Sequence, residues 1–282
     1  MNLLAAILGR RISWRIGRSL YMQARREVGS NMQLNGEHLL QRQIFQQFAN
    51  SSQTLVLFDV GANIGDWTHY ALERAAEHGM AGRLEIHAFE PVPSTFRTLA
   101  NRIKDHPLCD LVHLVSSALS SQEGSAEMFF VGDNAGTNSL HLDPNRNGLP
   151  QIQVEKTTID AYCQRNSIPM VHFIKCDAEG HDMEVLLGAR TLFEEQRIMV
   201  FQFEYNNIWI SSRHYLKDAF DFVAELPYDV GRLTPSGIEI YKEWHPELER
   251  FFEGNYVLIA DSALEWFNVQ IGHFDVSNTY SV

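Results

Sequence analysis

Two short polar segments follow apolar runs in this sequence, and the first is D-V-G-A-N-I-G from Asp59 to Gly65. Gly61 lets the chain turn with little steric restriction and lets a ligand approach the backbone. Gly65 stands where a helix is expected to begin, so the first N–H groups of that helix would point back toward a bound ligand. Asp59 can accept a hydrogen bond from a ligand ammonium group, directly or through water. The segment therefore predicts a ligand site at the carboxyl end of a strand.

The same segment discriminates between two nucleotide cofactors. A dinucleotide-binding turn normally reads G-x-G-x-x-G and cradles a pyrophosphate, whereas Asn63 takes the middle position here. The Asp59 carboxylate would repel a pyrophosphate but suits the amino group of an amino-acid moiety. We therefore expect S-adenosylmethionine as the cofactor, bound by Asp59, Gly61, Asn63 and Gly65. An NAD(P)-dependent oxidoreductase remains the alternative, disfavoured by this loop and by the lack of an obvious Tyr-x-x-x-Lys pair.

Glu90 ends the next apolar run, in F-E-P. A carboxylate at that strand end can accept hydrogen bonds from both hydroxyls of a ribose, each worth about 1.5–3 kcal/mol. Alternatively, Glu90 is only an exposed residue before Pro91, but its occurrence together with the Asp59 loop favours cofactor binding. Ser117 follows the third apolar run and is placed to line the adenine, although a serine at a strand end is often only solvated.

The second polar segment is K-C-D-A-E-G-H-D from Lys175 to Asp182. It crowds Asp177, Glu179, His181 and Asp182 at the expected start of a helix. Helix capping explains one or two acids there, because each gains only about 0.3–1 kcal/mol from the helix dipole. Four titratable groups beside a lysine indicate a functional cluster at the same sheet edge as Asp59.

The elements that would position these segments alternate between strand and helix, which indicates an α/β fold with a mostly parallel sheet. We expect one such domain at 51–262, a helical N-terminal extension at 1–50 and a C-terminal tail at 263–282. A hairpin with a long loop near 125–157 interrupts the alternation. The expected strands are 54–60, 84–89, 111–115, 171–176, 198–203, 228–233 and 256–259, and the expected helices are 65–78, 93–104, 158–166, 180–189 and 215–226.

With its two motifs and F-E-P, this sequence resembles the FkbM family of methyltransferases over roughly residues 35–260. N-G-E at Asn35 to Glu37 and T-T-I-D at Thr157 to Asp160 add to the resemblance. It implies a class I methyltransferase (Rossmann-like) fold, with a seven-stranded sheet and helices on both faces. It also implies methylation of a hydroxyl oxygen, on sugars of bacterial polysaccharides or on polyketides. Ala178 and His181 depart from the family, which often has Val and an aromatic residue there.

Methyl transfer to a hydroxyl requires that the acceptor be held in line with the methyl group and that a base remove the proton, a contribution of about 10²–10⁴-fold. We expect Asp177 or His181 as the base, with Glu179 beside them. Asp177, Glu179 and, as a further candidate, Glu204 offer the oxygen ligands that Mg²⁺ prefers, so a metal is left open. The loop 134–139 is expected either to close over a sugar acceptor or to form a flexible hairpin tip.

The charge and cysteine content exclude some partners. A net charge of −12 disfavours non-specific binding to nucleic acid, because binding of phosphates relies on Lys and Arg. The three cysteines form no C-x-x-C pair and indicate a reducing compartment, with the cytosol as the expectation. The first 26 residues carry six arginines and no acid, interleaved with apolar residues. This basic segment predicts a helix that docks on the domain or on a second subunit, or one that lies on an anionic membrane surface. Besides the methyltransferase and the oxidoreductase, a third possible function is a non-catalytic module that binds a membrane or a partner protein through this segment.

Overall fold

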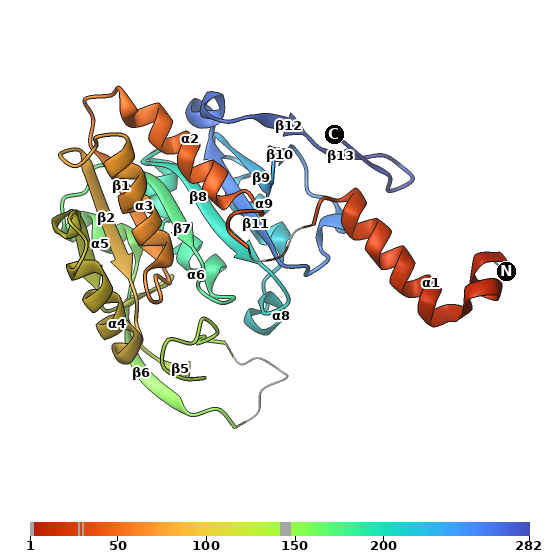
Figure 1. The fold of residues 1–282 in the computed structure, drawn as a ribbon, viewed down its shortest axis with the longest axis horizontal. Coiled ribbons are helices and arrows are strands. Elements are labelled where there is room, and N and C mark those ends of the chain that lie inside the picture. The colour runs from red at the N-terminus through yellow and green to blue at the C-terminus, as the bar shows by residue number, and fades with distance from the viewer. Residues whose placement is uncertain (1–2, 28, 30, 142–147) are drawn as a thin grey trace.

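The computed structural model describes residues 1–282 except 1–2, 28, 30 and 142–147 (Figure 1). Within those residues, a nine-stranded sheet runs in the order β12-β10-β9-β11-β8-β7-β1-β2-β3. A three-stranded sheet (β4-β6-β5) and a two-stranded one (β13-β14) accompany it. The strands are β1 Leu55–Val60, β2 Leu84–Phe89, β3 Val112–Val115, β4 Ala118–Leu119, β5 Gly124–Phe129, β6 Gln151–Thr157, β7 Val171–Cys176, β8 Ile198–Tyr205, β9 Tyr228–Thr234, β10 Gly237–Tyr241, β11 Gly254–Ala260, β12 Val269–Ile271, β13 His273–Phe274 and β14 Tyr280–Ser281.

The helices cover both faces of the large sheet. Trp67 of α3 packs edge-on against Phe173 of β7, and α2 lies beside α3. The opposite face is covered by α5, α7 and α9, where Tyr162 packs on Phe58 and Phe193 on Phe201. The helices are α1 Leu3–Ala24, α2 Glu37–Ala49, α3 Asp66–Glu77, α4 Pro93–Lys104, α5 Ile159–Arg165, α6 Asp182–Leu187, α7 Arg190–Glu194, α8 Trp209–Ser212 and α9 Leu216–Val223, with 3-10 turns at Cys109–Leu111, Pro246–Leu248 and Asp261–Trp266.

The α/β architecture agrees with the sequence, but the sheet has nine strands instead of the expected seven, and it is mixed, with an antiparallel part beside the parallel one. Strands β3, β2, β1, β7 and β8 are parallel, and every residue of β1 and β7 is buried, as expected for strands covered on both faces. Beyond β8 the pairs β8–β11, β11–β9 and β9–β10 are antiparallel. A short turn joins β9 to β10, because antiparallel neighbours need no crossover helix between them. The ninth strand, β12, comes from residues 263–282, which we expected to form a tail.

The strand order reverses direction at β1. The chain winds from β1 to β2 and β3 on one side, passes through the small β4-β6-β5 sheet, and returns as β7 on the other side of β1. Ligands of open α/β sheets bind beyond the carboxyl ends of the strands at such a switch point. The two polar segments follow β1 and β7, so the topology brings them together there.

A basic helix projects from this body. Figure 1 shows α1 extending away from the sheet, with the N-terminus at its far end. Gly9 has a φ of 72°, which breaks the helix near its beginning. None of the described helices is both long and apolar enough to cross a membrane.

A buried ion network attaches the end of α1 to the antiparallel half of the sheet. The guanidinium group of Arg232 donates to Glu239 Oε2 at 2.8 Å, to Glu27 Oε1 at 2.6 Å and to the carbonyl oxygen of Arg25. The side chains of Arg232 and Glu239 are only 3% and 2% exposed. The network therefore joins the segment after α1 to β9 and β10 across more than 200 residues of chain.

Arg232→Leu is expected to lower the free energy of unfolding by about 3–5 kcal/mol, because it leaves the buried carboxylate of Glu239 without its cation. Lys242→Leu is the matched control. Its ammonium group pairs with Asp229 but is 59% exposed, so we expect a change of about 0–1 kcal/mol. Urea denaturation of both variants measures the difference. If Arg232→Leu lowered the free energy of unfolding as little as Lys242→Leu, the Arg232 network would not stabilise the fold.

Candidate active site

A row of buried polar side chains crosses the sheet beneath α2 and α3. Asp59 of β1 is in register with Lys175 of β7, and Lys175 is in register with Gln202 of β8. Asp59 is fully buried, and its Oδ2 accepts a hydrogen bond of 2.6 Å from Thr68 Oγ1 of α3. Its Oδ1 has no hydrogen-bond donor within the part of the chain that the structure describes, and it lies 3.8 Å from Lys175 Nζ.

Lys175 is the cation of this row. Its ammonium group also donates to Asp177 Oδ2 at 3.2 Å. Burial opposes its charge, but the carboxylates of Asp177, Asp59 and Glu37 outweigh burial and hold the pKa of Lys175 above its usual value. Burial raises the pKa of Asp59. Asp59 therefore faces a protein ammonium group and does not line the cavity, whereas the sequence predicted that it binds the ligand directly or through water.

Glu37 completes the row from the first residue of α2. Gln202 Nε2 donates to its Oε2 at 2.9 Å, and the amides of Asn35 and Asn255 donate to its Oε1 at 2.6 and 3.2 Å. The preceding Gly36 has a φ of 98°, and a Cβ there would lie 2.5 Å from the carbonyl oxygen of Thr234. The N-G-E segment thus turns tightly against β9 and directs Glu37 toward β7 and β8.

The glycines of the first motif serve close packing. Gly61 has a φ of 72°, and a Cβ there would overlap the carbonyl oxygen of Asp177. The loops after β1 and β7 can approach this closely only because Gly61 has no side chain. Gly65 has a φ of 87°, and a Cβ there would lie 2.5 Å from Leu99 Cδ1 of α4. Gly61 lines the cavity between the loops, whereas Gly65 does not.

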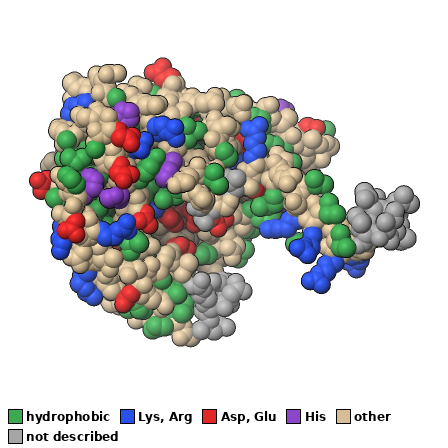
Figure 2. Space-filling view, viewed as in Figure 1, with side chains coloured by type: hydrophobic (Ala, Val, Ile, Leu, Met, Phe, Trp, Pro, Cys, Tyr) green, Lys and Arg blue, Asp and Glu red, His purple; other side chains and the backbone are tan. Residues whose placement is uncertain are grey.

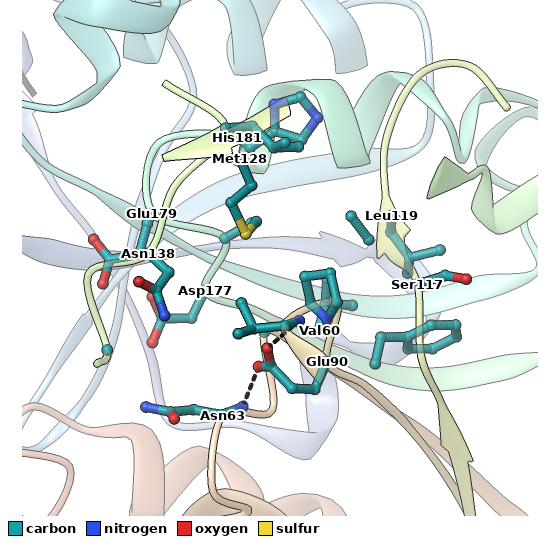
Figure 3. Close-up of a pocket in the computed structure, with 18 of the residues that line it drawn as sticks. Val60, Asn63, Glu90, Ser117, Leu119, Met128, Asn138, Asp177, Glu179 and His181 are labelled. Atoms are coloured by element: carbon teal, nitrogen blue, oxygen red, sulfur yellow. Dashed lines mark hydrogen bonds between the residues drawn. The ribbon is translucent and has the colours of Figure 1, made fainter. Parts of the chain in front are cut away.

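Glu90 lies at the centre of the cavity wall (Figure 3). Its Oε2 accepts from the backbone N–H of Asn63 at 3.0 Å and its Oε1 from that of Val92 at 2.8 Å. Burial raises the pKa of Glu90 to about 7. These bonds fix the carboxylate while leaving each oxygen a lone pair for a ligand hydroxyl. Asn63 has a φ of 48°, and its buried Oδ1 has no partner among the described residues.

One end of the cavity is largely apolar. Figure 3 shows Ser117 and Leu119 on one side of Glu90 and Asp177 with Glu179 on the other. Ser117 lines the cavity together with Ala118 and Leu119, and Val92 and Met128 add further apolar surface. The arrangement suits a flat, weakly polar group beside Ser117 and a polar group beside Asp177.

Asp177 and Glu179 present their carboxylates from the turn between β7 and α6. The Asp177 side chain is 40% exposed and keeps its Oδ1 free of the Lys175 bond. Glu179 has a φ of 51°, and burial, with the nearby Asp177 and Asp182, raises its pKa to about 8. Asp182 is buried and accepts from the N–H groups of Ala178 and Gly180 at 3.4 and 3.2 Å, so its role is to hold this turn.

His181 lines the cavity, but both of its ring nitrogens have protein partners. Its Nε2 lies 3.0 Å from Ser120 Oγ, and its Nδ1 lies 2.9 Å from His141 Nε2. Burial and the neighbouring His141 lower the pKa of His181 to about 3. Ser139 Oγ also donates to the carbonyl oxygen of Glu179 at 2.7 Å. The geometry thus differs from the catalytic role expected of His181, because this imidazole fastens the loop after β5 to the β7–α6 turn.

That loop forms one wall of the cavity. Ala135, Gly136 and Asn138 line it. Asn138 Oδ1 accepts from the Val131 N–H at 2.8 Å, so this amide shapes the loop itself. The 134–139 segment therefore lies over the space beside Asp177 instead of standing away as an open hairpin tip.

A model of the methyltransferase FkbM domain matches residues 59–230, which is more than half of the chain. The chain belongs to the FkbM methyltransferase family. The matched range begins at Asp59 and includes Glu90, Ser117 and the segment from Lys175 to Asp182.

Individual relatives of this FkbM-family chain are distant. It is 24% identical over 181 residues to the hexuronic acid methyltransferase AglP of Haloferax volcanii, covering 64% of this chain and 68% of that one. It is 25% identical over 149 residues to methyltransferase 1 of Beauveria bassiana, covering 47% of this chain and 57% of that one. The crystal structure of methyltransferase FkbM from Methylobacillus flagellatus KT is similar at 17% identity and a TM-score of 0.46, over 72% of this chain and 43% of that one.

Three carboxylates of this FkbM-family chain meet at the polar end of the cavity. Oxygen atoms of Asp177, Glu179 and Glu204 lie within 4.8 Å of one another. Figure 2 shows acidic side chains gathered in a hollow at the centre of the face that is turned toward the viewer. Burial and the charges of Asp177 and Glu179 raise the pKa of Glu204. Oxygen donors in this arrangement are of the type that Mg²⁺ binds. The raised pKa values equally suit carboxyl groups that share protons without a metal.

Sequence reasoning missed Thr68 and Gln202, and it named Glu37 and Lys175 without placing them in the buried row. Gln202 lies in an apolar run from which only a strand was predicted. A single polar residue inside an apolar run indicates a buried polar contact, because an unpaired polar group is costly to bury. Glu37 was signalled by N-G-E, but its approach to β8 depends on tertiary packing.

Glu179→Gln should flatten the pH dependence of stability. A carboxyl group with a raised pKa binds its proton more tightly in the folded protein, so the stability it contributes is present below its unfolded pKa of 4.5 and is lost as the pH rises toward about 8. Urea denaturation between about pH 5 and pH 8.5 should show the free energy of unfolding falling less for the variant than for the wild type. The exposed Glu225→Gln is the control. Parallel curves for both variants would contradict the assignment.

Proposed function

We propose that this chain is an S-adenosylmethionine-dependent O-methyltransferase that acts on a hydroxyl group of a sugar, a glycan or a hydroxylated metabolite. The observation that carries the proposal is the position of Glu90, fixed by two backbone N–H groups between an apolar recess and the Asp177 carboxylate. A nucleoside matches this arrangement: its flat base suits the apolar recess, and the two hydroxyls of the adjoining ribose suit Glu90. Family membership supports methyl transfer over the NAD(P)-dependent alternative.

The residues that are present fit this cofactor. Glu90 would hold the ribose hydroxyls, and Ser117, Ala118 and Leu119 would lie against the adenine. The unpartnered Asn63 Oδ1 and the backbone at Gly61 remain for the amino-acid portion. When bound, the cofactor supplies a methyl group on a positively charged sulfur, which the neighbouring carboxylates stabilise.

Asp177 is the base that this geometry favours. Its Oδ2 is held by the Lys175 ammonium group, which orients the carboxylate and stabilises its negative charge, and its Oδ1 remains for the proton of an acceptor hydroxyl. His181 is a weaker candidate because both of its ring nitrogens are bonded. Mg²⁺ is not required by this assignment.

A carbohydrate acceptor is supported by the relative that is a hexuronic acid methyltransferase. In this chain, Asp177, Glu179 and Glu204 line or adjoin the polar end of the cavity. The negative charge of Asp177 disfavours a carboxylate on the acceptor, because like charges at this distance repel in a partly desolvated site, and Glu179 and Glu204 add to this repulsion when they are ionised. The chain therefore favours an uncharged sugar hydroxyl over the carboxylate end of a uronic acid.

Glu90→Ala and Asp177→Asn should separate binding from chemistry. We expect Glu90→Ala to weaken S-adenosylmethionine binding by about 10–100-fold, because it removes hydrogen bonds to a charged group. Asp177→Asn should keep cofactor affinity near the wild-type value and lower turnover by about 10²–10⁴-fold. Titration calorimetry measures the first effect, and release of S-adenosylhomocysteine with neutral glycosides and hexuronic acids as acceptors measures the second.

Each outcome has a separate meaning. Unchanged affinity in Glu90→Ala would remove the ribose role, and unchanged turnover in Asp177→Asn would remove the base. Wild-type protein that binds neither S-adenosylmethionine nor S-adenosylhomocysteine would overturn the cofactor assignment. Binding without turnover on any acceptor would favour the non-catalytic module.

We also propose that α1 brings the enzyme to an anionic membrane surface. The apolar residues Ile12, Trp14, Ile16 and Leu20 are between 44% and 65% exposed, and Figure 2 shows Lys and Arg side chains along the projecting helix. The end of the helix is attached to the body through Tyr21 and Arg18, which contact the ring of Phe252. Anionic lipid headgroups complement the arginines, and acyl chains complement the exposed apolar side chains. A second copy of this chain, which is strongly acidic outside the helix, is the competing occupant.

Replacing Arg10, Arg11 and Arg15 by Glu should reduce binding to phosphatidylglycerol vesicles by at least tenfold, since each arginine near an anionic surface contributes about 1 kcal/mol. Vesicles of phosphatidylcholine are the control and should bind neither protein strongly. Co-sedimentation measures the difference. Equal binding of both proteins to anionic vesicles, or dimerisation that the substitutions abolish, would contradict the membrane proposal.

A further inference from the structure

Two imidazoles and a carboxylate converge on the sheet face covered by α5, on strands at the opposite end of the molecule from α1 (Figure 1). His87 of β2 is in register with His113 of β3, and Glu85 lies two residues before His87 on the same face. Glu85 Oε1 lies 2.9 Å from His87 Nε2 and 3.5 Å from His113 Nε2. The two imidazole rings stack with centroids 4.7 Å apart and planes 16° apart. Both Nε2 atoms therefore face the same carboxylate oxygen.

The inner histidine is fixed in place by its surroundings. His87 Nδ1 lies 2.8 Å from Tyr162 Oη of α5, and the rings of Phe58 and Phe89 pack around the pair. A histidine whose second ring nitrogen is held by a hydrogen bond has its other nitrogen oriented toward a metal, which is the arrangement that His87 and Tyr162 form.

The outer two groups are accessible. The side chains of His113 and Glu85 are 53% and 36% exposed, so solvent reaches the point where the three donors meet. All three ligand atoms lie within 4.8 Å of one another. Ligands of a tetrahedral Zn²⁺ ion lie about 3.3 Å apart, which follows from bond lengths of about 2.0–2.1 Å. Because the lone pairs of stacked imidazoles lie in nearly parallel planes, binding of one ion requires the exposed His113 ring to rotate out of the stack, so that its Nε2 points toward an ion held by His87 and Glu85.

We propose that Glu85, His87 and His113 form a Zn²⁺ site, separate from the methyltransferase cavity, with water as the fourth ligand. Two imidazole nitrogens and one carboxylate oxygen are a ligand set that Zn²⁺ accepts readily. The three carboxylates at Asp177, by contrast, are donors of the type that Mg²⁺ favours. Because β3 is the edge strand of the sheet, the ion joins that edge to the buried β2.

Without metal, the same groups form a closed hydrogen-bonded network. The Tyr162 hydroxyl then donates to His87 Nδ1, and the His87 Nε2–H donates to Glu85. The Zn²⁺ form requires the opposite tautomer, in which His87 Nδ1–H donates to Tyr162 Oη and Nε2 binds the ion. These two forms make different predictions for added metal and for Tyr162→Phe.

The test is titration calorimetry of the full chain with ZnCl₂, supported by the visible absorption of Co²⁺ as a probe of four-coordinate geometry. We expect one strong site in the wild type and at least a tenfold loss of affinity in His113→Ala. Tyr162→Phe should weaken Zn²⁺ binding by about 10–100-fold, as for other residues that orient a metal ligand. Thermal unfolding should shift upward with Zn²⁺ in the wild type and not in His113→Ala.

His69→Ala is the matched control. His69 is also a half-exposed histidine beside a carboxylate, with its Nε2 3.5 Å from Glu73 Oε1 and its ring 5.2 Å from that of His106. It should retain the strong Zn²⁺ site. A wild-type protein without strong Zn²⁺ binding, or equal affinity in the wild type and His113→Ala, would overturn the proposal and leave the hydrogen-bonded network as the description of these residues.

Discussion

The buried ammonium group of Lys175 is the interaction on which the functional end of the sheet depends. Transfer of a charged group from water to a protein interior costs several kcal/mol, even after relaxation. Here Asp59 and Asp177 lie within 4 Å of Lys175 Nζ, and Glu37 adds its charge from α2. The carboxylates are themselves buried or partly buried, so each of these groups needs the others. Removal of any one leaves charge that the remaining residues must either neutralise by protonation or expose to water.

This mutual dependence has a structural consequence. The row spans β1, β7 and β8 and includes the first turn of α2 and, through Thr68, the first turn of α3. Five elements from distant parts of the sequence therefore meet at one point just below the cavity. A site that holds a ligand to within a fraction of an ångström needs such support beneath the residues that touch it. The polar row, rather than the cavity wall itself, provides this support.

The loops above the row were predictable from sequence to different degrees. The strand ends at Asp59, Glu90 and Asp177 could be located, because long apolar runs followed by polar residues mark buried strands and their exits. The direction of the Asp59 side chain could not be inferred, because it depends on which neighbour offers a cation, and Lys175 lies more than 100 residues away. Likewise, His181 reads as a candidate base until Ser120 and His141 are seen to occupy its nitrogens.

The fold shows the same division between local and distant determinants. Alternating strands and helices up to β8 follow from local periodicity, and the parallel half of the sheet could be predicted. The strands β9 and β11 were also located, but their antiparallel pairing and the strands β10 and β12 could not be predicted, because short strands joined by turns have several possible partners and packing selects among them. Gly231 illustrates this constraint: a Cβ there would lie 2.5 Å from Ile238 Cγ2 of β10, so the close contact between β9 and β10 requires a glycine. The antiparallel strands are also where Arg232 holds the segment after α1. The candidate site thus lies at the parallel half of the sheet, and the basic helix is attached at the antiparallel half.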